Sequence, residues 1–573
     1  MIDAPRRRWL ADLAAPAAAL ATYLGLAGYL TAGLWRSPDR RALSFLDGAD
    51  ELLLQWYLAH AAHAVTHLGN PFFTTDINMP AGVNLAANAS VLGLGVPLAP
   101  LTLLFGAGVT TCLVVLGSLA GTATAWYWLL SRQLRLHRGA AWAGGLFCGF
   151  APPLVLESAY GHQHIAAQFL VPLIAWRFVR LADGRPLRGG LIFGGLVAYQ
   201  ALIGEEVLLL TAVGVAGFAL AYALLRPREA RAAAPAVARG LLVGAAVAAS
   251  LLAVPLAYQF AGPQHYGGNP IDPQPFHADL LDYLGLPDPT RTPLASALHH
   301  RYPVAGLPVV LLLLAFARPL RRNVIFTSAL LVFGGIMLLS LGTRITVDHH
   351  RTGLPGPWRA VAHLPVFEWV IPERIGQLAV PAAGVAIAVI VDRALTRWHR
   401  LGSPATLVAT ALALATLTPL PFTTLTLPRV PRFVTAGTWR GYVPPGRSLT
   451  TVPAPSLASF DAMRWASATR GDVPITGGYF LGPSADGRST LFGPPTSWTT
   501  GMLETVARSG RVWAAAPGDR DRLLRDLRYG RVSVLVLVPG CRNAHALRAT
   551  VEAFLGPAHQ VDDVLLWDVR TVT

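Results

Sequence analysis

Residues 44–88 read SFLDGADELLLQWYLAHAAHAVTHLGNPFFTTDINMPAGVNLAAN and stand between the first two long apolar runs of the chain. Three acids, Asp47, Asp50 and Glu51, open a segment that then reads as an amphipathic helix. Ionisable groups at the edge of a bilayer are costly unless they bind or react with something. We therefore expect the rest of the chain to be organised around this stretch.

The composition is typical of a polytopic membrane protein. Of the 573 residues, 53% are hydrophobic and 13% are charged, whereas soluble proteins have about 25% charged residues. Three cysteines are too few for a disulfide framework. The apolar runs predict an α-helical polytopic membrane protein with about 11 transmembrane helices. These runs cover roughly 10–34, 109–131, 140–156, 163–176, 190–204, 207–225, 241–257, 303–317, 324–341, 375–391 and 404–421.

The arginines gather in alternate connections between these runs and predict the topology. These connections hold 20 arginines against four acids, a charge of +16, so the remainder of the chain is about −1. The arginines are Arg6, Arg7, Arg8, Arg132, Arg135, Arg138, Arg177, Arg180, Arg185, Arg188, Arg226, Arg228, Arg231, Arg239, Arg318, Arg321, Arg322, Arg393, Arg397 and Arg400. The positive-inside rule places them in the cytoplasm. This distribution argues against a nucleic-acid partner despite the net charge of +15.

The same rule predicts a multi-pass plasma-membrane protein with a cytoplasmic N-terminus. For the spans to alternate, residues 89–107 must not cross, and Pro97 and Pro100 interrupt that run. Residues 1–425 then form a transmembrane domain with outer loops 35–108, 258–302 and 342–374. From about 426 to 573, short buried-type strands alternate with helical patterns, which predicts an extracytoplasmic α/β domain. Four aromatic residues there could stack on sugars, but we favour packing in its core: Tyr479, Phe480, Trp498 and Trp513.

The acids and histidines of the outer side have both structural and functional interpretations. Asp47 and Asp50 could cap a helix, although capping does not account for three acids. His60, His63 and His67 share a helical stripe about 150° from Glu51, and we favour interface histidines over a metal site.

Two further groups of polar residues lie at span ends. His162 and His164 could satisfy backbone groups or bind a ligand, and Glu206 follows Glu205 between two spans. Arg374 could pair with Glu373 or Glu368, or clamp a phosphate. Asp279 is better read as a helix cap.

Several short motifs, in order, resemble a family of actinobacterial membrane proteins of the GT-C class of glycosyltransferases. In the first outer loop these are Asp50, Trp56, Gly69-Asn70-Pro71-Phe72 and Pro80-x-Gly82-x-Asn84-Leu85. Gly161-His162, Glu206, the Asp279 segment, and Leu364-Pro365 to Pro372-Glu373-Arg374 follow. The resemblance covers about residues 1–400 and implies the class of enzyme, but not its substrate.

The resemblance implies an enzyme that moves a hexose or pentose from a polyprenyl-phosphate donor to a glycan, lipid or protein acceptor of the cell envelope. It implies that Asp50, with Asp47 second and Glu51 open, is the catalytic base. Such a base typically contributes about 10²–10⁴-fold. We expect Arg374 and His162 to bind the donor phosphate, and Glu206 and His164 to orient a partner or hold a metal. Whether Mg²⁺ or Mn²⁺ takes part stays open. The alternative function is a transporter or flippase of a lipid-linked sugar.

Overall fold

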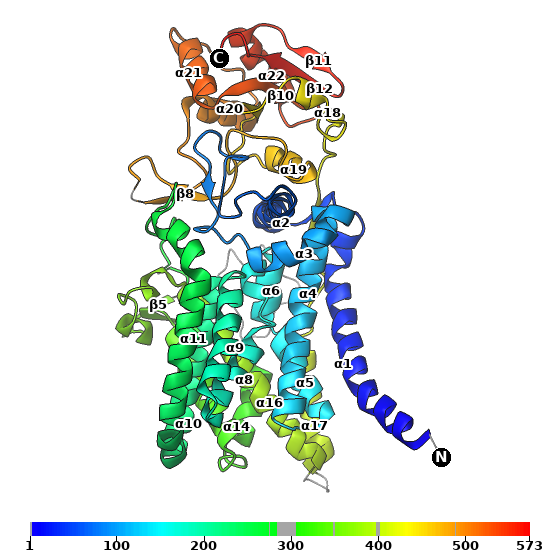
Figure 1. The fold of residues 1–573 in the computed structure, drawn as a ribbon, viewed down its shortest axis with the longest axis vertical. Helices are drawn as coiled ribbons and strands as arrows, with labels where there is room; N and C mark the ends of the chain where they lie inside the picture. The colour runs from blue at the N-terminus through cyan, green and yellow to red at the C-terminus, as the bar shows by residue number, and fades with distance from the viewer. Residues whose placement is uncertain (1–2, 274, 284–304, 348–349, 397–401, 488) are drawn as a thin grey trace.

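The computed structural model describes residues 3–273, 275–283, 305–347, 350–396, 402–487 and 489–573. A bundle of long helices fills the lower part of the molecule, and a smaller α/β domain lies at the upper end, where the C-terminus is found (Figure 1). Helix α2 (Ala49–His67) lies across the top of the bundle, beneath that domain. The stretch with the acid cluster therefore separates the two parts of the molecule.

The bundle helices follow the apolar runs of the sequence. They are α1 (Asp3–Trp35), α4 (Ala107–Trp128), α5 (Arg138–Phe150), α6 (Pro152–Ala159), α7 (Gln163–Ala166), α8 (Val171–Val179), α9 (Pro186–Ala201), α10 (Glu205–Leu225), α11 (Pro227–Ala261), α13 (Gly306–Ala317), α14 (Val324–Ser340), α15 (Pro372–Ile375), α16 (Ala379–Thr396) and α17 (Gly402–Ala415). In the described part of the chain, seven helical segments are long and apolar enough to cross a membrane. The helical fold class is confirmed, while the number of spans stays a prediction.

Helices α9 and α11 show why glycine is frequent in this bundle. An added Cβ on Gly190 would lie 2.6 Å from the carbonyl oxygen of Gly240, and one on Gly194 would lie 2.4 Å from that of Gly244. Small residues four apart on both helices let the two backbones approach closely, as membrane helices do in the absence of a hydrophobic driving force. The glycines of this span therefore permit close helix packing.

The run at 89–107 forms α3 (Leu92–Phe105), which packs against α2 and α4. It has 14 residues and contains Pro97 and Pro100. A helix this short reaches about 21 Å, less than the thickness of a bilayer core of about 30 Å. Helices α13 and α17 are no longer than α3, so the expectation that this segment does not cross stays a prediction.

The first outer loop also contains three short strands. Strand β1 (Arg41–Leu43) pairs with β6 (Thr424–Thr426), which follows the last apolar helix. Strand β2 (Phe73–Thr74) pairs with β3 (Val83–Asn84) beyond α2. A further hairpin, β4 (Arg344–Val347) and β5 (His350–Pro355), lies at the side of the bundle. The β1–β6 pair joins the start of the acid-bearing stretch to the start of the C-terminal domain.

The C-terminal domain is built on a four-stranded mixed sheet in the order β11-β12-β10-β7. The strands are β7 (Ser448–Thr451), β10 (Val532–Leu537), β11 (His559–Val561) and β12 (Val564–Asp568), and only β7 and β10 run parallel. The helices are α18 (Arg432–Thr435), α19 (Asp461–Ala468), α20 (Trp498–Ser509), α21 (Asp519–Tyr529) and α22 (Ala544–Leu555), and the hairpin is β8 (Leu481–Pro483) with β9 (Thr490–Phe492). The expected α/β character is present.

The two faces of this sheet belong to different hydrophobic cores. Val534 and Val536 of β10 pack in one cluster with Trp56 of α2 and Trp465 of α19. The alternate residues of β10, such as Leu535, pack with α20, α21 and α22 on the other face. Alternation of side chains along a strand produces this division. The C-terminal domain therefore shares a continuous core with α2.

Candidate active site

A cavity of about 400 Å³ lies where α2, the upper end of the bundle and the C-terminal domain meet. Its walls come from segments far apart in the sequence: the start of α2, the α6–α7 turn, the start of α10, the segment before α16, and the β8–β9 region. Polar side chains from each of these segments line it, including Asp50, Glu157, His162, His164, Glu206, Arg374 and Tyr479.

Asp50 lies in the first turn of α2 and lines the cavity. Helix α2 begins after Gly48, whose φ of 83° is readily adopted only by glycine. The Tyr479 hydroxyl donates to Asp50 Oδ1 at 2.8 Å, and His162 Nε2 lies 3.3 Å from Asp50 Oδ2. Burial alone would raise the pKa of Asp50, but the hydrogen bonds with His162 and Tyr479 outweigh it and lower that pKa. Asp50 is therefore an ionised carboxylate at neutral pH.

His162 lies between two carboxylates. Its Nε2 faces Asp50, and its Nδ1 lies 2.6 Å from Glu157 Oε2. Burial opposes the charge on the imidazole, yet the hydrogen bonds with Asp50 and Glu157 raise the pKa of His162 to about 9. An imidazole between two acceptors needs a proton on both nitrogens, so His162 is an imidazolium at neutral pH.

The α6–α7 turn brings His162 to α2 through a glycine. Gly161 has a φ of 85°, and a Cβ there would lie 2.8 Å from the backbone nitrogen of Glu51. No other residue permits this backbone conformation together with such a close approach. Gly161 therefore fixes the distance between His162 and Asp50.

Arg374 extends the same polar network toward the opposite wall. Its Nε lies 3.3 Å from Glu157 Oε1, and its Nη1 donates to Glu206 Oε2 at 2.9 Å. Gln377 donates to Glu157 Oε1 at 3.2 Å. Glu157, which is 2% exposed, thus has cationic or amide donors around both oxygens. Alternating charges, acid to cation to acid, run across the cavity wall from Asp50 to Glu206.

The structure places most of the predicted site residues, but not all of them, around the cavity. Asp50, His162, His164, Glu206 and Arg374 all line the cavity. Asp47 lies in a short 3-10 helix, Phe45–Gly48, but its side chain falls outside the described residues.

Glu51 differs from the expectation that it shares the site with Asp50. It does not line the cavity: its carboxylate is 3% exposed and accepts a hydrogen bond from the backbone N–H of Leu43. Burial raises the pKa of Glu51 to about 7, although that hydrogen bond opposes the shift. Neighbouring residues on a helix point about 100° apart, so only one of these two acids can face the cavity.

Tyr479 is the site residue that sequence reasoning assigned to the core of the C-terminal domain. It is indeed largely buried, with its ring stacked on Phe492 at a centroid distance of 5.8 Å, but its hydroxyl reaches Asp50. Glu157, near the end of α6, is the centre of the network, since it contacts His162, Arg374 and Gln377. No local pattern marks either role, because both depend on contacts between distant segments.

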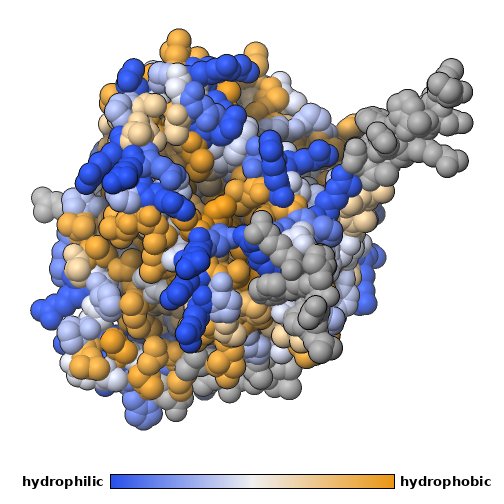
Figure 2. Space-filling view, turned by 90° about the horizontal axis from the view of Figure 1, so that it is seen from below, coloured by the Kyte–Doolittle hydropathy of each residue, from blue (hydrophilic) through white to orange (hydrophobic). Residues whose placement is uncertain are grey.

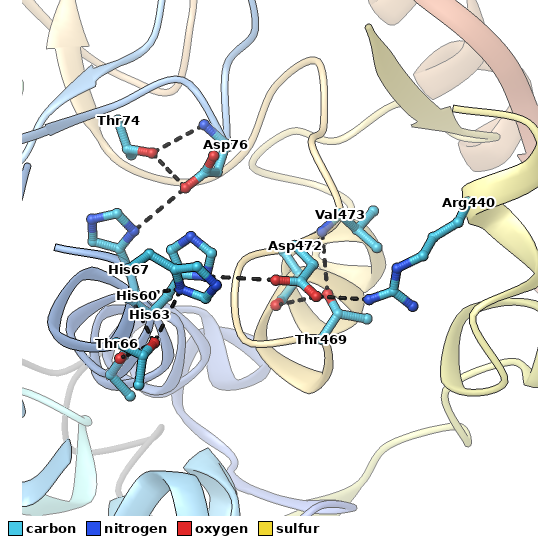
Figure 3. Close-up of polar contacts among 12 residues, drawn as sticks. His60, His63, Thr66, His67, Thr74, Asp76, Arg440, Thr469, Asp472 and Val473 are labelled. Atoms are coloured by element: carbon cyan, nitrogen blue, oxygen red, sulfur yellow. Dashed lines mark hydrogen bonds and ion pairs between the residues drawn. The ribbon is translucent and has the colours of Figure 1, made fainter. Parts of the chain in front are cut away.

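None of the three histidines of the α2 stripe, His60, His63 and His67, lines the cavity. Figure 3 shows His60 and His63 in contact with the loops that carry Asp76 and Asp472. His60 Nδ1 lies 3.6 Å from Asp76 Oδ2, and His63 Nδ1 lies 3.5 Å from Asp472 Oδ1. Asp472 also pairs with Arg440 at 2.7 Å, on the side opposite the histidines. The His63 contact joins α2 to the C-terminal domain, whereas the His60 contact joins α2 to the loop that follows β2.

The described residues do not fit a divalent metal ion. No three His, Cys, Asp or Glu side chains among them are arranged to hold one. Of the acids that metal binding would need, Asp50 and Glu157 contact His162, and Glu206 contacts Arg374. Each of these three acids therefore pairs with a cationic side chain in this arrangement instead of sharing a metal position with the others, although Mg²⁺ and Mn²⁺ prefer such oxygen ligands.

Comparisons with known proteins bear on the fold. No protein-family model and no curated protein sequence matches the chain. Among solved structures, the arabinofuranosyltransferase AftD from Mycobacteria is 16% identical with a TM-score of 0.53, over 98% of this chain and 41% of AftD. The chain has a GT-C fold. The oligosaccharyltransferase AglB from Archaeoglobus fulgidus is also similar, at 12% identity and a TM-score of 0.48, over 93% of this chain and 71% of that one.

The GT-C fold accounts for the overall plan of the molecule. The resemblance stated from the motifs of the outer loops is confirmed at the level of the fold. The chain spans less than half of AftD, and the sequence identity is low. The similarity therefore concerns the architecture alone.

Proposed function

We propose that this protein is a membrane glycosyltransferase that moves a sugar from a polyprenyl-phosphate donor to an acceptor hydroxyl on the outer side of the membrane. The observation that supports the proposal is the position of Asp50, which contacts Tyr479 and His162 in a cavity at one end of a GT-C bundle.

The reaction is a single displacement with inversion. The acceptor hydroxyl attacks the anomeric carbon and its proton passes to Asp50, while the bond between that carbon and the phosphate oxygen breaks. Each oxygen of a carboxylate can accept more than one hydrogen bond, so the contacts of Asp50 leave room for the acceptor. The proton and the sugar both have a destination, and the leaving group departs as a polyprenyl phosphate.

The charge that develops on the departing phosphate needs fixed cations. His162 and Arg374 line the cavity and carry positive charge, and both are held in place by carboxylates. Donors that are oriented before the reaction stabilise developing charge without reorganisation. We assign the donor phosphate to this side of the cavity, with His164 and Glu206 beside it. No step uses a metal, since the acids already contact these cations.

The acceptor approaches from the C-terminal domain. Tyr479, Phe480, Leu481 and Phe492 of that domain form one wall of the cavity. Aromatic side chains offer flat apolar faces that suit the faces of sugar rings. We therefore assign the envelope acceptor, whether glycan, lipid or protein, to this wall. In the proposed orientation the N-terminus is cytoplasmic and the C-terminal domain is outside.

The test compares two adjacent acids. Purified protein in proteoliposomes is given a panel of pentose and hexose polyprenyl phosphates with a cell-envelope extract as acceptor, and release of polyprenyl phosphate and formation of glycoside are measured. Asp50→Asn should lower the rate by about 10²–10⁴-fold. Glu51→Gln retains an acceptor for the Leu43 N–H and should stay within a few fold of the wild type.

Full transferase activity in Asp50→Asn would contradict the base assignment. Movement of the lipid-linked sugar across the membrane without any glycosidic product, in the wild type, would support a flippase instead.

A further inference from the structure

A second cavity lies at the opposite end of the bundle from Asp50. It has a volume of about 500 Å³ and is formed where the end of α4 and the start of α5 meet α1 and the end of α16. The helical segment Ala107–Gln133 runs between the two ends and has 27 residues, a length of about 40 Å. The second cavity is therefore distinct from the candidate active site. Figure 2 views this end of the molecule and shows hydrophilic side chains standing among apolar ones.

The lining of this cavity is strongly positive. Arg132, Arg135 and Arg138 contribute to it, against the single acid Asp392. Asp392 already accepts a hydrogen bond from the backbone N–H of His137 at 2.8 Å. Within the described residues, Arg132 and Arg135 form neither an ion pair nor a side-chain hydrogen bond. Two arginines thus line one cavity without forming an ion pair with its single acid.

A buried hydroxyl of the same cavity also lacks a partner. Tyr127 lines it and is 6% exposed, and its hydroxyl has no hydrogen-bond partner among the described residues. A buried polar atom without a partner costs about 1–3 kcal/mol. Arginines at the ends of membrane helices are common, but they ordinarily extend into the headgroup layer rather than surround a cavity with an unpaired hydroxyl. A ligand with acceptor oxygens would satisfy both the arginines and Tyr127.

The backbone is irregular where these groups are presented. The end of α4 continues as a π-helical turn, Leu129–Gln133, and Arg135 follows with a φ of 53°. π-Helical turns occur frequently at functional sites. A residue with a side chain costs about 1–2 kcal/mol in this left-handed region. The irregular turn brings Arg132 and Arg135 to the same cavity.

We propose that this cavity binds a phosphate group, from the headgroup of an anionic lipid or from free phosphate. The planar guanidinium matches phosphate oxygens with paired hydrogen bonds, and a tyrosine hydroxyl can donate another. The position at the end of apolar helices is where lipid headgroups lie. The site is independent of the proposed transfer reaction, because it shares no residue with the first cavity.

The test measures binding by native mass spectrometry of the purified protein in detergent. Phosphatidylglycerol, diacylglycerol with the same acyl chains and inorganic phosphate are added in separate experiments, and inorganic phosphate is also added as a competitor of the lipid. Arg132→Gln/Arg135→Gln removes the two unpaired cations, and Tyr127→Phe removes only the hydroxyl. Arg188→Gln is the matched control, since it changes an exposed arginine that does not line the cavity.

The wild type and Arg188→Gln should bind phosphatidylglycerol and not diacylglycerol. Binding should weaken about tenfold or more in the double variant, and less in Tyr127→Phe. Binding of inorganic phosphate without phosphatidylglycerol, lost in the same variants, would identify free phosphate as the ligand. The proposal would be overturned if the wild type and the double variant bound each ligand equally, or if neither bound any. If the double variant does not fold, the comparison of Tyr127→Phe with the wild type provides the test instead.

Discussion

Tyr479 and Asp50 are 429 positions apart in the chain and share a hydrogen bond of 2.8 Å. The bond has two consequences. It helps to keep the pKa of Asp50 low, and it makes a residue of the C-terminal domain part of the environment of the proposed base. Tyr479 is a positioning residue in this scheme, because it acts on Asp50 rather than on the substrate.

Tyr479→Phe keeps the ring that stacks on Phe492 and removes only the hydroxyl. The pKa of Asp50 should rise, so the acid limb of the pH–rate profile should move to higher pH. A hydrogen bond to a charged group is worth about 1.5–3 kcal/mol, so we expect a fall in kcat of about tenfold at the pH optimum. Tyr442→Phe, which changes a tyrosine packed on Phe433 away from the cavity, is the control. An unshifted acid limb in Tyr479→Phe would show that the hydroxyl does not act on Asp50.

His162 should make the thermal stability of the protein depend on pH in the alkaline range. Its pKa is raised to about 9 in the folded protein, against about 6.5 when unfolded. A raised pKa contributes stability that is fully present below the unfolded value and is lost as the pH rises through the folded value. The Tm of the wild type should therefore fall between pH 7 and pH 10 by more than the Tm of His162→Gln. The melting curves of both proteins over this range provide the measurement, and parallel curves would contradict the assignment of an imidazolium.

At the scale of elements, the site depends on how closely the α6–α7 turn approaches α2. Glu157, Gly161 and His162 come from this turn and from the helix before it, and they reach the start of α2 and the segment before α16. A small displacement of the turn would therefore change the contacts of both proposed cations. The glycine at the point of contact is the most direct way to test this.

Gly161→Ala places a Cβ 2.8 Å from the backbone nitrogen of Glu51, at a φ of 85°. Gly184→Ala has a similar φ of 76° but open space around its Cβ. The strain of a left-handed residue, about 1–2 kcal/mol, is thus common to both variants. Gly161→Ala should lower transferase activity about tenfold or more because His162 moves away from Asp50, while Gly184→Ala should lower the Tm alone. Equal activities of the two variants would mean that the close approach of the turn to α2 is not needed.

At the scale of the whole molecule, α2 is shared between two bodies. It packs on α3 and α4 below and on α19 above, and its Trp56 belongs to the same core as the sheet of the C-terminal domain. The amino-acid composition thus changes at the domain boundary expected near residue 425, but the parts on either side of it share one hydrophobic core. The C-terminal domain helps to hold the helix that carries Asp50.

Trp465→Ala removes a buried side chain from this shared core. Leu547→Ala removes one from the core on the far face of the sheet. Large-to-small changes of these kinds cost about 2–5 kcal/mol. Hydrogen exchange should show that α2 loses protection in Trp465→Ala and retains it in Leu547→Ala, with transferase activity following α2. Equal protection of α2 in the two variants would show that the shared core does not support it.

Several features of the protein could be predicted from the sequence because they depend on local composition. The apolar runs correspond to helices, and the motifs of the outer loops indicate the GT-C fold that the structure confirms. The residues expected at one end of the bundle, Asp50, His162, Glu206 and Arg374, do line one cavity. Segment ends at the same side of a bundle are close together whatever the details of packing, and this made the group predictable.

The sequence by itself thus determined which segments are apolar helices and which polar residues lie at their ends. The reason is that each residue's transfer into a membrane depends on its own chemistry. Only the tertiary structure decided that Asp50 rather than Glu51 faces the cavity, because the two differ by about 100° on a helix whose rotation is set by packing. It alone decided that Arg374 pairs with Glu157 and Glu206, and that Tyr479 reaches Asp50. Those contacts join segments that are distant in the chain, and only the packing of the whole molecule brings them together.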